Sequence, residues 1–295
     1  MNAAAGNPRS DALRAAVWMI GAIAAFTAMA IAGRAVSFEL DTFEIMMYRS
    51  MIGLIVVLIV SRSVGTHLQI TRRHMGLQVA RNLSHFAGQN LWFFALPMIP
   101  LAQLFALEFT APLWALLLAP LVLGERLTRP RVIAAALGFV GILIVARPSP
   151  ETLSIGVVAA AIAAIGFAGT AVFTRRLTRT QTLTCILFWM TALQSIFGLI
   201  CAGYDLDIAI PSASSAPWIV VIAFAGLVAH FCLTTALSIA PATVVMPVDF
   251  ARLPLIALIG MLFYNEPISI FVFLGALVIF TANYVNILLE TRKSN

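Results

Sequence analysis

Long apolar runs dominate the chain, and short polar or basic segments separate them. The runs are close to twenty residues long and continuous, as in 17–32 or in 51–60 with its flanks. A membrane β-strand would instead alternate apolar and polar residues over about ten residues. A helix needs about 20 apolar residues to cross about 30 Å of hydrocarbon. We therefore predict an all-α membrane protein with spans at 13–33, 43–61, 74–96, 100–122, 130–147, 153–174, 181–203, 217–238, 241–263 and 267–289.

The distribution of charge supports ten spans. Segment 74–96 is the least apolar, and we retain it because its removal would move the later basic loops to the opposite side of the membrane. With both termini cytoplasmic, most of the 18 Lys and Arg residues fall in cytoplasmic segments, as the positive-inside rule requires. The first run then serves as a retained helix rather than a cleaved signal peptide. We expect a bacterial inner-membrane protein with both termini in the cytoplasm.

Composition agrees with lipid as the main solvent. Hydrophobic residues make up 61% of the chain, and only 10% are charged, against about 25% in soluble domains. The net charge of +6 is explained by basic cytoplasmic loops, so no nucleic-acid partner is implied. The three cysteines lie in or at the ends of apolar segments without metal-ligand spacing. We expect neither a metal nor a cofactor.

The second half of the chain repeats the first. A shift of 141 residues, without gaps, superposes Pro100 on Pro241, Glu108 on Asp249, Phe109 on Phe250 and Glu125 on Glu266. The chain is thus predicted to hold two repeats, 1–148 and 149–295, of five helices each. Because five is odd, the second repeat enters the membrane inverted. Inverted repeats are typical of carriers that work by alternating access.

The motifs of helices four and five resemble the EamA family of the drug/metabolite transporter superfamily. They are Glu108-Phe-Thr-Ala-Pro112, Leu123-Gly-Glu-Arg-Leu127 and Ala136-Leu-Gly-Phe-Val-Gly-Ile-Leu-Ile144. Tyr264-Asn-Glu-Pro267 repeats the second motif weakly. The resemblance implies a ten-helix basket around a central cavity, acting as a monomer. It also implies export of small metabolites, foremost amino acids including neutral or aromatic ones. Multidrug and sugar-phosphate or nucleotide-sugar carriers are the alternatives within the family.

Polar residues at membrane depth are the candidates for the substrate cavity, because burying them is costly unless they pair or face water. Arg81, His85 and Gln89 follow one face of segment 74–96, with Asn82 and Trp92 beside it. This stripe suits a zwitterion, although helix-to-helix hydrogen bonds would explain it as well. Two further candidates are His230 and Thr27, the latter within Ala25-Phe26-Thr27-Ala28, where the family often has Trp-Gly.

Three acidic or basic residues are candidates for a charge pair or for ion coupling. Asp249 and Arg252 are spaced to pair on one helix, and Glu108 is the repeat partner of Asp249. Arg49 is expected to pair with Glu44 near the outer interface. Candidates for gating or structural roles are Glu125, Glu266, Pro112, Pro247 and Pro254, because carboxylates cap helices and prolines kink them.

Other functional classes find little support. The sequence contains no His-Glu-x-x-His, Gly-x-Ser-x-Gly or nucleotide-binding Gly-x-x-x-x-Gly-Lys-Ser/Thr motif, so no catalytic residue is predicted. A channel would require a continuous pore lined by carbonyl or charged rings. The prolines of helices four and nine fit moving elements better. A channel and an intramembrane enzyme remain the alternatives to a carrier.

Overall fold

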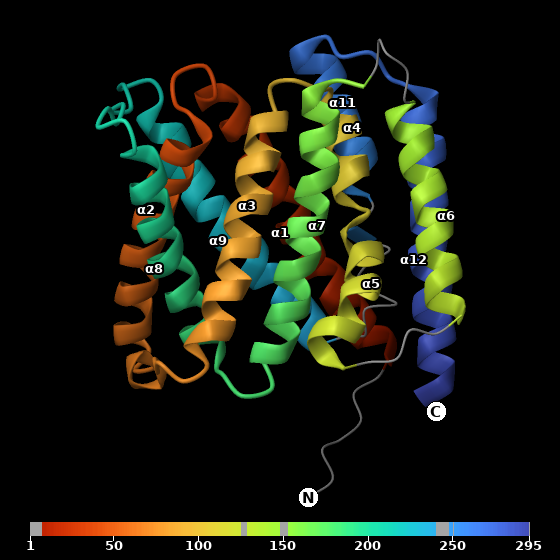
Figure 1. Cartoon of the computed structure of the whole chain (residues 1–295), viewed down its shortest axis with the longest axis horizontal. Helices are drawn as coiled ribbons and strands as arrows, with labels where there is room; N and C mark the ends of the chain where they lie inside the picture. Colours follow the sequence, from red (N-terminus) through yellow and green to blue (C-terminus); the bar gives the residue numbers. More distant parts are fainter. Residues whose placement is uncertain (1–7, 125–128, 148–152, 240–247, 250, 295) are drawn as a thin grey trace, which may run out of the picture.

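The computed structural model describes residues 8–124, 129–147, 153–239, 248–249 and 251–294. Over these residues the helices stand side by side in one bundle (Figure 1), with α2 and α8 at one edge and α6 and α12 at the other. In chain order, the elements are α1 (Pro8–Val36), α2 (Thr42–Ser63), η1 (His67–Gln69), α3 (Met75–Ala95), α4 (Leu101–Glu108), α5 (Ala111–Leu123), α6 (Arg129–Ala146), α7 (Ile155–Leu177), α8 (Leu183–Ala202), α9 (Ala216–Ile239), α11 (Arg252–Tyr264) and α12 (Ile270–Ser294).

Several helices are long and apolar enough to cross a membrane. In the part of the chain that the structure describes, six segments meet this description: Leu13–Val36, Thr42–Ser63, Leu101–Leu123, Ile155–Leu177, Leu183–Ala202 and Ala216–Leu233. Shorter apolar helices occupy Val132–Ala146, Arg252–Tyr264 and Ile270–Val285. Helix α3 is not among these segments, because its polar residues lower its mean hydropathy. The chain is a multi-pass, all-helical membrane protein.

The predicted span 100–122 is not one continuous helix. It divides into α4 and α5, with a turn at Phe109 and Thr110 in which the backbone N–H of Thr110 bonds Leu107 O at 3.1 Å. Pro112 explains the break, because it has no N–H to donate to the carbonyl of Glu108 and its ring crowds that carbonyl. The span is present as Leu101–Leu123, and the break, which the prolines led us to expect, places Glu108 at a helix end.

The corresponding segment of the second half shows a related arrangement. Residues 248–249 are helical and α11 starts at Arg252, with Pro254 in its first turn. The backbone N–H of Ala251 bonds Val248 O at 3.0 Å. Most of the first part of the predicted span 241–263, including Pro247, lies outside the described residues. Each of the other predicted spans overlaps one helix.

Four pairs of helices form the main contacts: α1 with α9, α3 with α7, α2 with α8 and α6 with α12. Glycines bring several of these pairs close together. A Cβ on Gly166 of α7 would lie 2.7 Å from the Cα of Gly88 on α3. A Cβ on Gly198 of α8 would lie 2.7 Å from the Cα of Met47 on α2. Small residues therefore set the distance between these helices, as is common where lipid is the solvent.

The connection between α8 and α9 is fastened to the start of α2 and the end of α1. The backbone N–H of Ala209 donates to Glu44 at 2.6 Å, and that of Ser212 donates to Glu39 at 2.6 Å. Hydrogen bonds from the Ser215 hydroxyl, and then from the backbone and hydroxyl of Ser212, hold the pKa of Glu39 below its usual value. Glu39 thus stays ionised and ties the two halves together at this end of the bundle.

A capping box starts α2. Asp41 accepts from the backbone N–H of Glu44 at 2.8 Å, and Glu44 accepts from that of Asp41 at 2.8 Å. We expect Asp41→Ala to lower the free energy of unfolding by about 1 kcal/mol, because the orphan N–H groups of the first turn lose an acceptor. Thermal unfolding in detergent measures the effect, and Asp41→Asn, which keeps an acceptor, is the matched control. Equal midpoints for the alanine variant and the unmodified protein would contradict the role of this cap.

Candidate functional site

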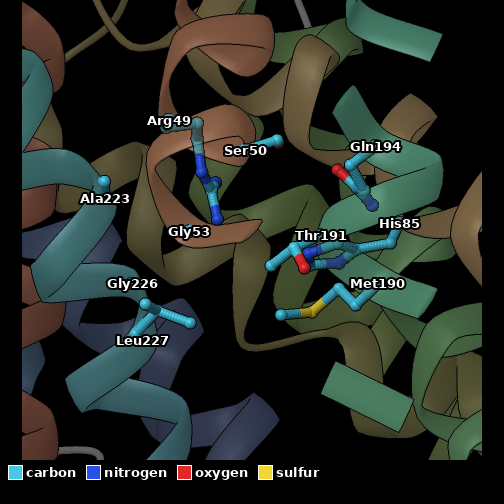
Figure 2. Close-up of a pocket in the computed structure, with 10 residues that line it drawn as sticks. All are labelled: Arg49, Ser50, Gly53, His85, Met190, Thr191, Gln194, Ala223, Gly226 and Leu227. Atoms are coloured by element: carbon cyan, nitrogen blue, oxygen red, sulfur yellow. The ribbon is translucent and has the colours of Figure 1, made fainter. Parts of the chain in front are cut away.

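A small cavity lies inside the bundle between α2, α3, α8 and α9. Its volume is about 20 Å³, which is room for about one water molecule. Polar side chains from three of these helices reach it, whereas α9 contributes small and apolar residues (Figure 2). The lining residues are Arg49, Ser50, Gly53, His85, Met190, Thr191, Gln194, Ala223, Gly226 and Leu227.

Arg49 supplies the positive charge of the cavity. Its side chain is buried, and its guanidinium donates to the side-chain oxygen of Gln89 on α3. Space for the guanidinium comes from Gly226 on α9, where an added Cβ would lie 3.2 Å from Arg49 Nη2. Among the described residues no carboxylate forms a salt bridge with Arg49. A buried cation without a countercharge is costly, so this position needs an explanation beyond stability.

Two more groups in the cavity have unused hydrogen-bonding capacity. Nδ1 of His85 and Nε2 of Gln194 are buried without a hydrogen-bond partner among the described residues. The His85 ring lies 6.3 Å from the ring of Phe167 and 6.0 Å from that of His230. Buried polar groups are almost always paired. Together with Arg49, these groups give the cavity polar atoms that are available to a polar ligand or to water.

The residues of the predicted polar stripe on α3 make two kinds of contact: some meet the cavity, and others bond neighbouring helices. His85 lines the cavity, and Gln89 meets Arg49 beside it. Arg81 bonds Thr174 Oγ1 of α7 at 3.1 Å and Asn82 Oδ1 at 3.0 Å. Asn82 donates to Gln78 O at 2.8 Å and to Trp189 O of α8 at 3.4 Å. Arg81 and Asn82 therefore join helices in this structure and do not line the cavity.

The remaining predicted cavity residues also lie outside the lining. Thr27 on α1 is buried, with its hydroxyl unpartnered among the described residues. The His230 ring contacts the ring of Phe26 at 5.7 Å, next to His85. Trp92 does not line the cavity and donates through Nε1 to Glu108 Oε2 at 2.8 Å. Of these three residues, His230 neighbours the cavity through its ring contact with His85.

A second polar cluster gathers the three predicted charged residues. Arg252 Nη2 lies 3.2 Å from Glu108 Oε1 and 3.2 Å from Asp249 Oδ2. The guanidinium carbon stacks over three rings, at 4.7 Å from the centroid of Phe26, 4.9 Å from Phe105 and 5.0 Å from Phe109. The i, i+3 pair expected from the sequence is present, and Glu108 joins it from the other half. We call Glu108, Asp249 and Arg252 the charged cluster.

A third cluster closes the end of the bundle where α1 and α3 end. Arg34 on α1 forms an ion pair with Glu266, and it donates to Leu96 O at 3.0 Å and to Ile99 O at 2.7 Å. Glu266 also accepts from the backbone N–H of Leu101, the first residue of α4, at 2.8 Å. Sequence reasoning placed Glu266 before its own helix, whereas the structure shows it capping a helix of the other half. The related residue Glu125 lies outside the described residues.

The prolines predicted to gate occupy helix starts. Pro112 is the second residue of α5, and Pro254 is the third residue of α11, where it is exposed. Neither lines the cavity.

Sequence reasoning missed Arg49 and Gln194 as cavity residues. The pairing proposed for Arg49 was wrong, because Glu44 bonds Asp41 and Ala209 instead. The two are five residues apart, which puts them on different faces of α2. A lone arginine at membrane depth with no acid at i±3 or i±4 was the available signal. For Gln194, the signal was an amide in the middle of the apolar segment 181–203, whose other amide, Gln181, is its first residue.

The chain is similar in sequence to several known transporters and in fold to a solved structure. A riboflavin transporter of Brucella anthropi is 32% identical over 71% of this chain and 75% of its own length. A riboflavin transporter of Vibrio cholerae is 26% identical over 96% of this chain and 95% of its own length. An S-adenosylmethionine uptake transporter of Rickettsia conorii is 24% identical, with 84% of each chain covered. One solved crystal structure, 19% identical, matches 95% of this chain and 99% of its own with a TM-score of 0.63, which supports the fold.

The model of the EamA-like transporter family matches the chain twice, over residues 13–147 and 154–288. The two matches cover both halves and nearly all of the described helices. This confirms the family that the motifs around Glu108 and Glu125 suggested. The chain is a membrane transporter and belongs to the EamA-like transporter family.

Proposed function

We propose that the chain is an alternating-access carrier of ten spans, built as two inverted repeats, 1–148 and 149–295. The pattern of helix pairs supports this arrangement. If the repeats are exchanged, the pair α1–α9 becomes α7–α3, and both are main contacts. The pairs α2–α8 and α6–α12 exchange into themselves. A bundle whose contacts survive this exchange can adopt two related conformations that open to opposite sides.

The placement in the membrane belongs to the same proposal. The first described residues of α1 and the last of α12 lie at the same end of the bundle (Figure 1), as an even number of crossings requires. The basic residues of the predicted cytoplasmic loops support an orientation with that end on the cytoplasmic side of the bacterial inner membrane. Helices of both halves of one chain line the cavity, which supports a monomer as the transporting unit.

The substrate that we propose is a planar, polar heterocyclic metabolite of the flavin class. The observation that carries this proposal is Arg49, a buried guanidinium that meets the cavity without a carboxylate partner among the described residues. His85 and Gln194 add unpaired groups that match the carbonyl and imide edge of such a ring. An aromatic ring, that of Phe167, lies 6.3 Å from the ring of His85. The riboflavin transporters among the relatives point to the same class.

Amino-acid export, which the sequence suggested, is the second candidate. Arg49 would also bind a carboxylate, by charge-assisted hydrogen bonds. The relatives reported above are named as transporters of riboflavin or S-adenosylmethionine, not of amino acids. Amino-acid export is therefore supported by the cavity alone. A cavity with room for about one water admits neither ligand, so the helices around it must separate during the transport cycle.

Counterflow in proteoliposomes tests the proposal. We expect labelled riboflavin to enter vesicles holding unlabelled riboflavin faster than empty vesicles, with a rate that saturates. Saturation and exchange are properties of a carrier and would be absent from a channel. Labelled amino acids and labelled S-adenosylmethionine, each tested with vesicles loaded with the same unlabelled compound, serve as competing candidates. Exchange of amino acids but not of riboflavin would replace the substrate class, and no exchange of any of them would overturn the proposal.

A further inference from the structure

The charged cluster carries an excess of negative charge inside the bundle. It contains two carboxyl groups and one guanidinium, and Arg252 is their shared partner at 3.2 Å. Exposure of Asp249 is 7% and that of Arg252 is 3%. If both carboxyl groups were ionised, one negative charge would remain buried without compensation, which is costly at membrane depth. The arrangement therefore favours one bound proton or another monovalent cation.

The hydrogen bonds of the charged cluster indicate which of the two carboxyl groups is free to bind a proton. Both oxygens of Glu108 accept, one from Trp92 Nε1 and the other from Arg252. Asp249 accepts through Oδ2 only, and its Oδ1 is buried without a partner among the described residues. Hydrogen bonds donated to both oxygens of a carboxyl group leave no oxygen free to carry a proton without displacing a donor. Glu108 is in this position, whereas Asp249 Oδ1 is the vacant position for a proton.

The groups that face Asp249 come from several helices. Glu108 lies on α4 and Arg252 on α11. Arg252 contacts both Asp249 and Glu108, each at 3.2 Å. His230 of α9 lies behind the ring of Phe26, which separates it from Arg252. Asn283 of α12 donates to Phe109 O at 3.3 Å, at the break between α4 and α5. Helix breaks at membrane depth are where carriers bind coupling ions.

We propose that Asp249 binds and releases the coupling proton of this carrier, and that proton and substrate move in the same direction. This inference rests on the proposed function. In the step, a proton from the aqueous phase on one side bonds to Asp249 Oδ1 and converts the carboxylate to the acid. The same O–H bond breaks to water on the other side after the conformational change. No other co-reactant is needed, and the net charge of the cluster changes from −1 to zero and back.

Movement in the same direction follows from the separation of the two sites. Between the cavity and the charged cluster lie rings in edge-to-face contact, from His85 to His230 at 6.0 Å and from His230 to Phe26 at 5.7 Å. Substrate and proton can then be bound together, which symport requires. Antiport would require them to compete for one site, and no residue of the cavity lining belongs to the charged cluster.

Two measurements distinguish this inference from the proposed function: proton-driven accumulation tests the proton site, and counterflow tests the carrier. In proteoliposomes with an acidic outside and labelled riboflavin outside, we expect the unmodified protein to accumulate riboflavin above its equilibrium level. Asp249→Asn should lose this accumulation completely but keep counterflow, because exchange moves no net proton. Counterflow without accumulation in the unmodified protein, or full accumulation in Asp249→Asn, would overturn the proton site and leave the carrier standing. Accumulation driven by an acidic inside would overturn symport.

Infrared spectroscopy of the purified protein gives a readout that needs no substrate. We expect the carbonyl band of a buried protonated carboxyl group at neutral pH, and its loss in Asp249→Asn. Glu108→Gln is the matched control, because it removes the acid whose two oxygens already accept hydrogen bonds and should leave the band in place. A band that persists in Asp249→Asn would show that another group carries the proton and would overturn the assignment.

Discussion

Replacing Arg49 by alanine is expected to lower the transport efficiency, kcat/KM, by about 10- to 100-fold. A hydrogen bond to a charged group contributes about 1.5–3 kcal/mol, which corresponds to this range of rates. Arg49 is the cation that faces the cavity, and its one described side-chain oxygen partner is Gln89. Initial rates of riboflavin counterflow, over a range of concentrations, measure the effect.

The same substitution should not destabilise the fold. Removing a buried guanidinium that has no carboxylate partner relieves a desolvation cost, so the unfolding midpoint in detergent should stay the same or rise. Arg49→Lys should recover part of the rate, because it keeps the charge but not the planar fork. Arg62→Ala is the matched control, since it removes an exposed guanidinium at the end of the same helix. A normal rate in Arg49→Ala would remove Arg49 from the substrate pathway.

The helices were predictable because the bilayer imposes one simple rule on them. Every backbone group must be satisfied within its own segment, so a run of apolar residues of sufficient length reads as a helix. Segment 74–96 was the hardest case, and the positions of the basic loops identified it where hydropathy did not. The ungapped match of Glu125 to Glu266 likewise identified the two repeats, because duplicated chains keep the residues that both halves use.

The arrangement of side chains was harder to predict because it depends on which helix faces meet. Spacing along one helix found the pair Asp249 and Arg252, which is local. It could not find that Glu108 joins them from the other half, or that Glu266 caps α4. It also grouped Arg81 with His85 on one stripe, although Arg81 bonds Thr174 of α7 and His85 lines the cavity. Contacts between the repeats require the tertiary fold.

Removing the carboxyl group of Glu266 should open the end of the bundle where α1 and α3 end. Glu266 holds Arg34 and the first N–H of α4, so Glu266→Ala leaves a buried guanidinium without its countercharge. Breaking such a pair costs about 3–5 kcal/mol in the closed state. In the open state, water would solvate Arg34 and avoid this cost. Since about 5.5 kcal/mol converts a ratio of 1:99 into 99:1, a rare open conformation should become a major one.

Labelling of a cavity cysteine measures this opening. In a chain whose three native cysteines are replaced by alanine, Ser50→Cys places a thiol in the cavity lining. With Glu266→Ala added, a membrane-impermeant maleimide should label that thiol faster from the side of the α1–α2 connection and not from the opposite side. Asp207→Ala is the matched control, because it removes an exposed acid in the α8–α9 connection, which is fastened to the same end through Glu44 and Glu39. Equal labelling with and without Glu266 would mean that the ion pair does not keep this end closed, because its loss would then leave the balance of conformations unchanged.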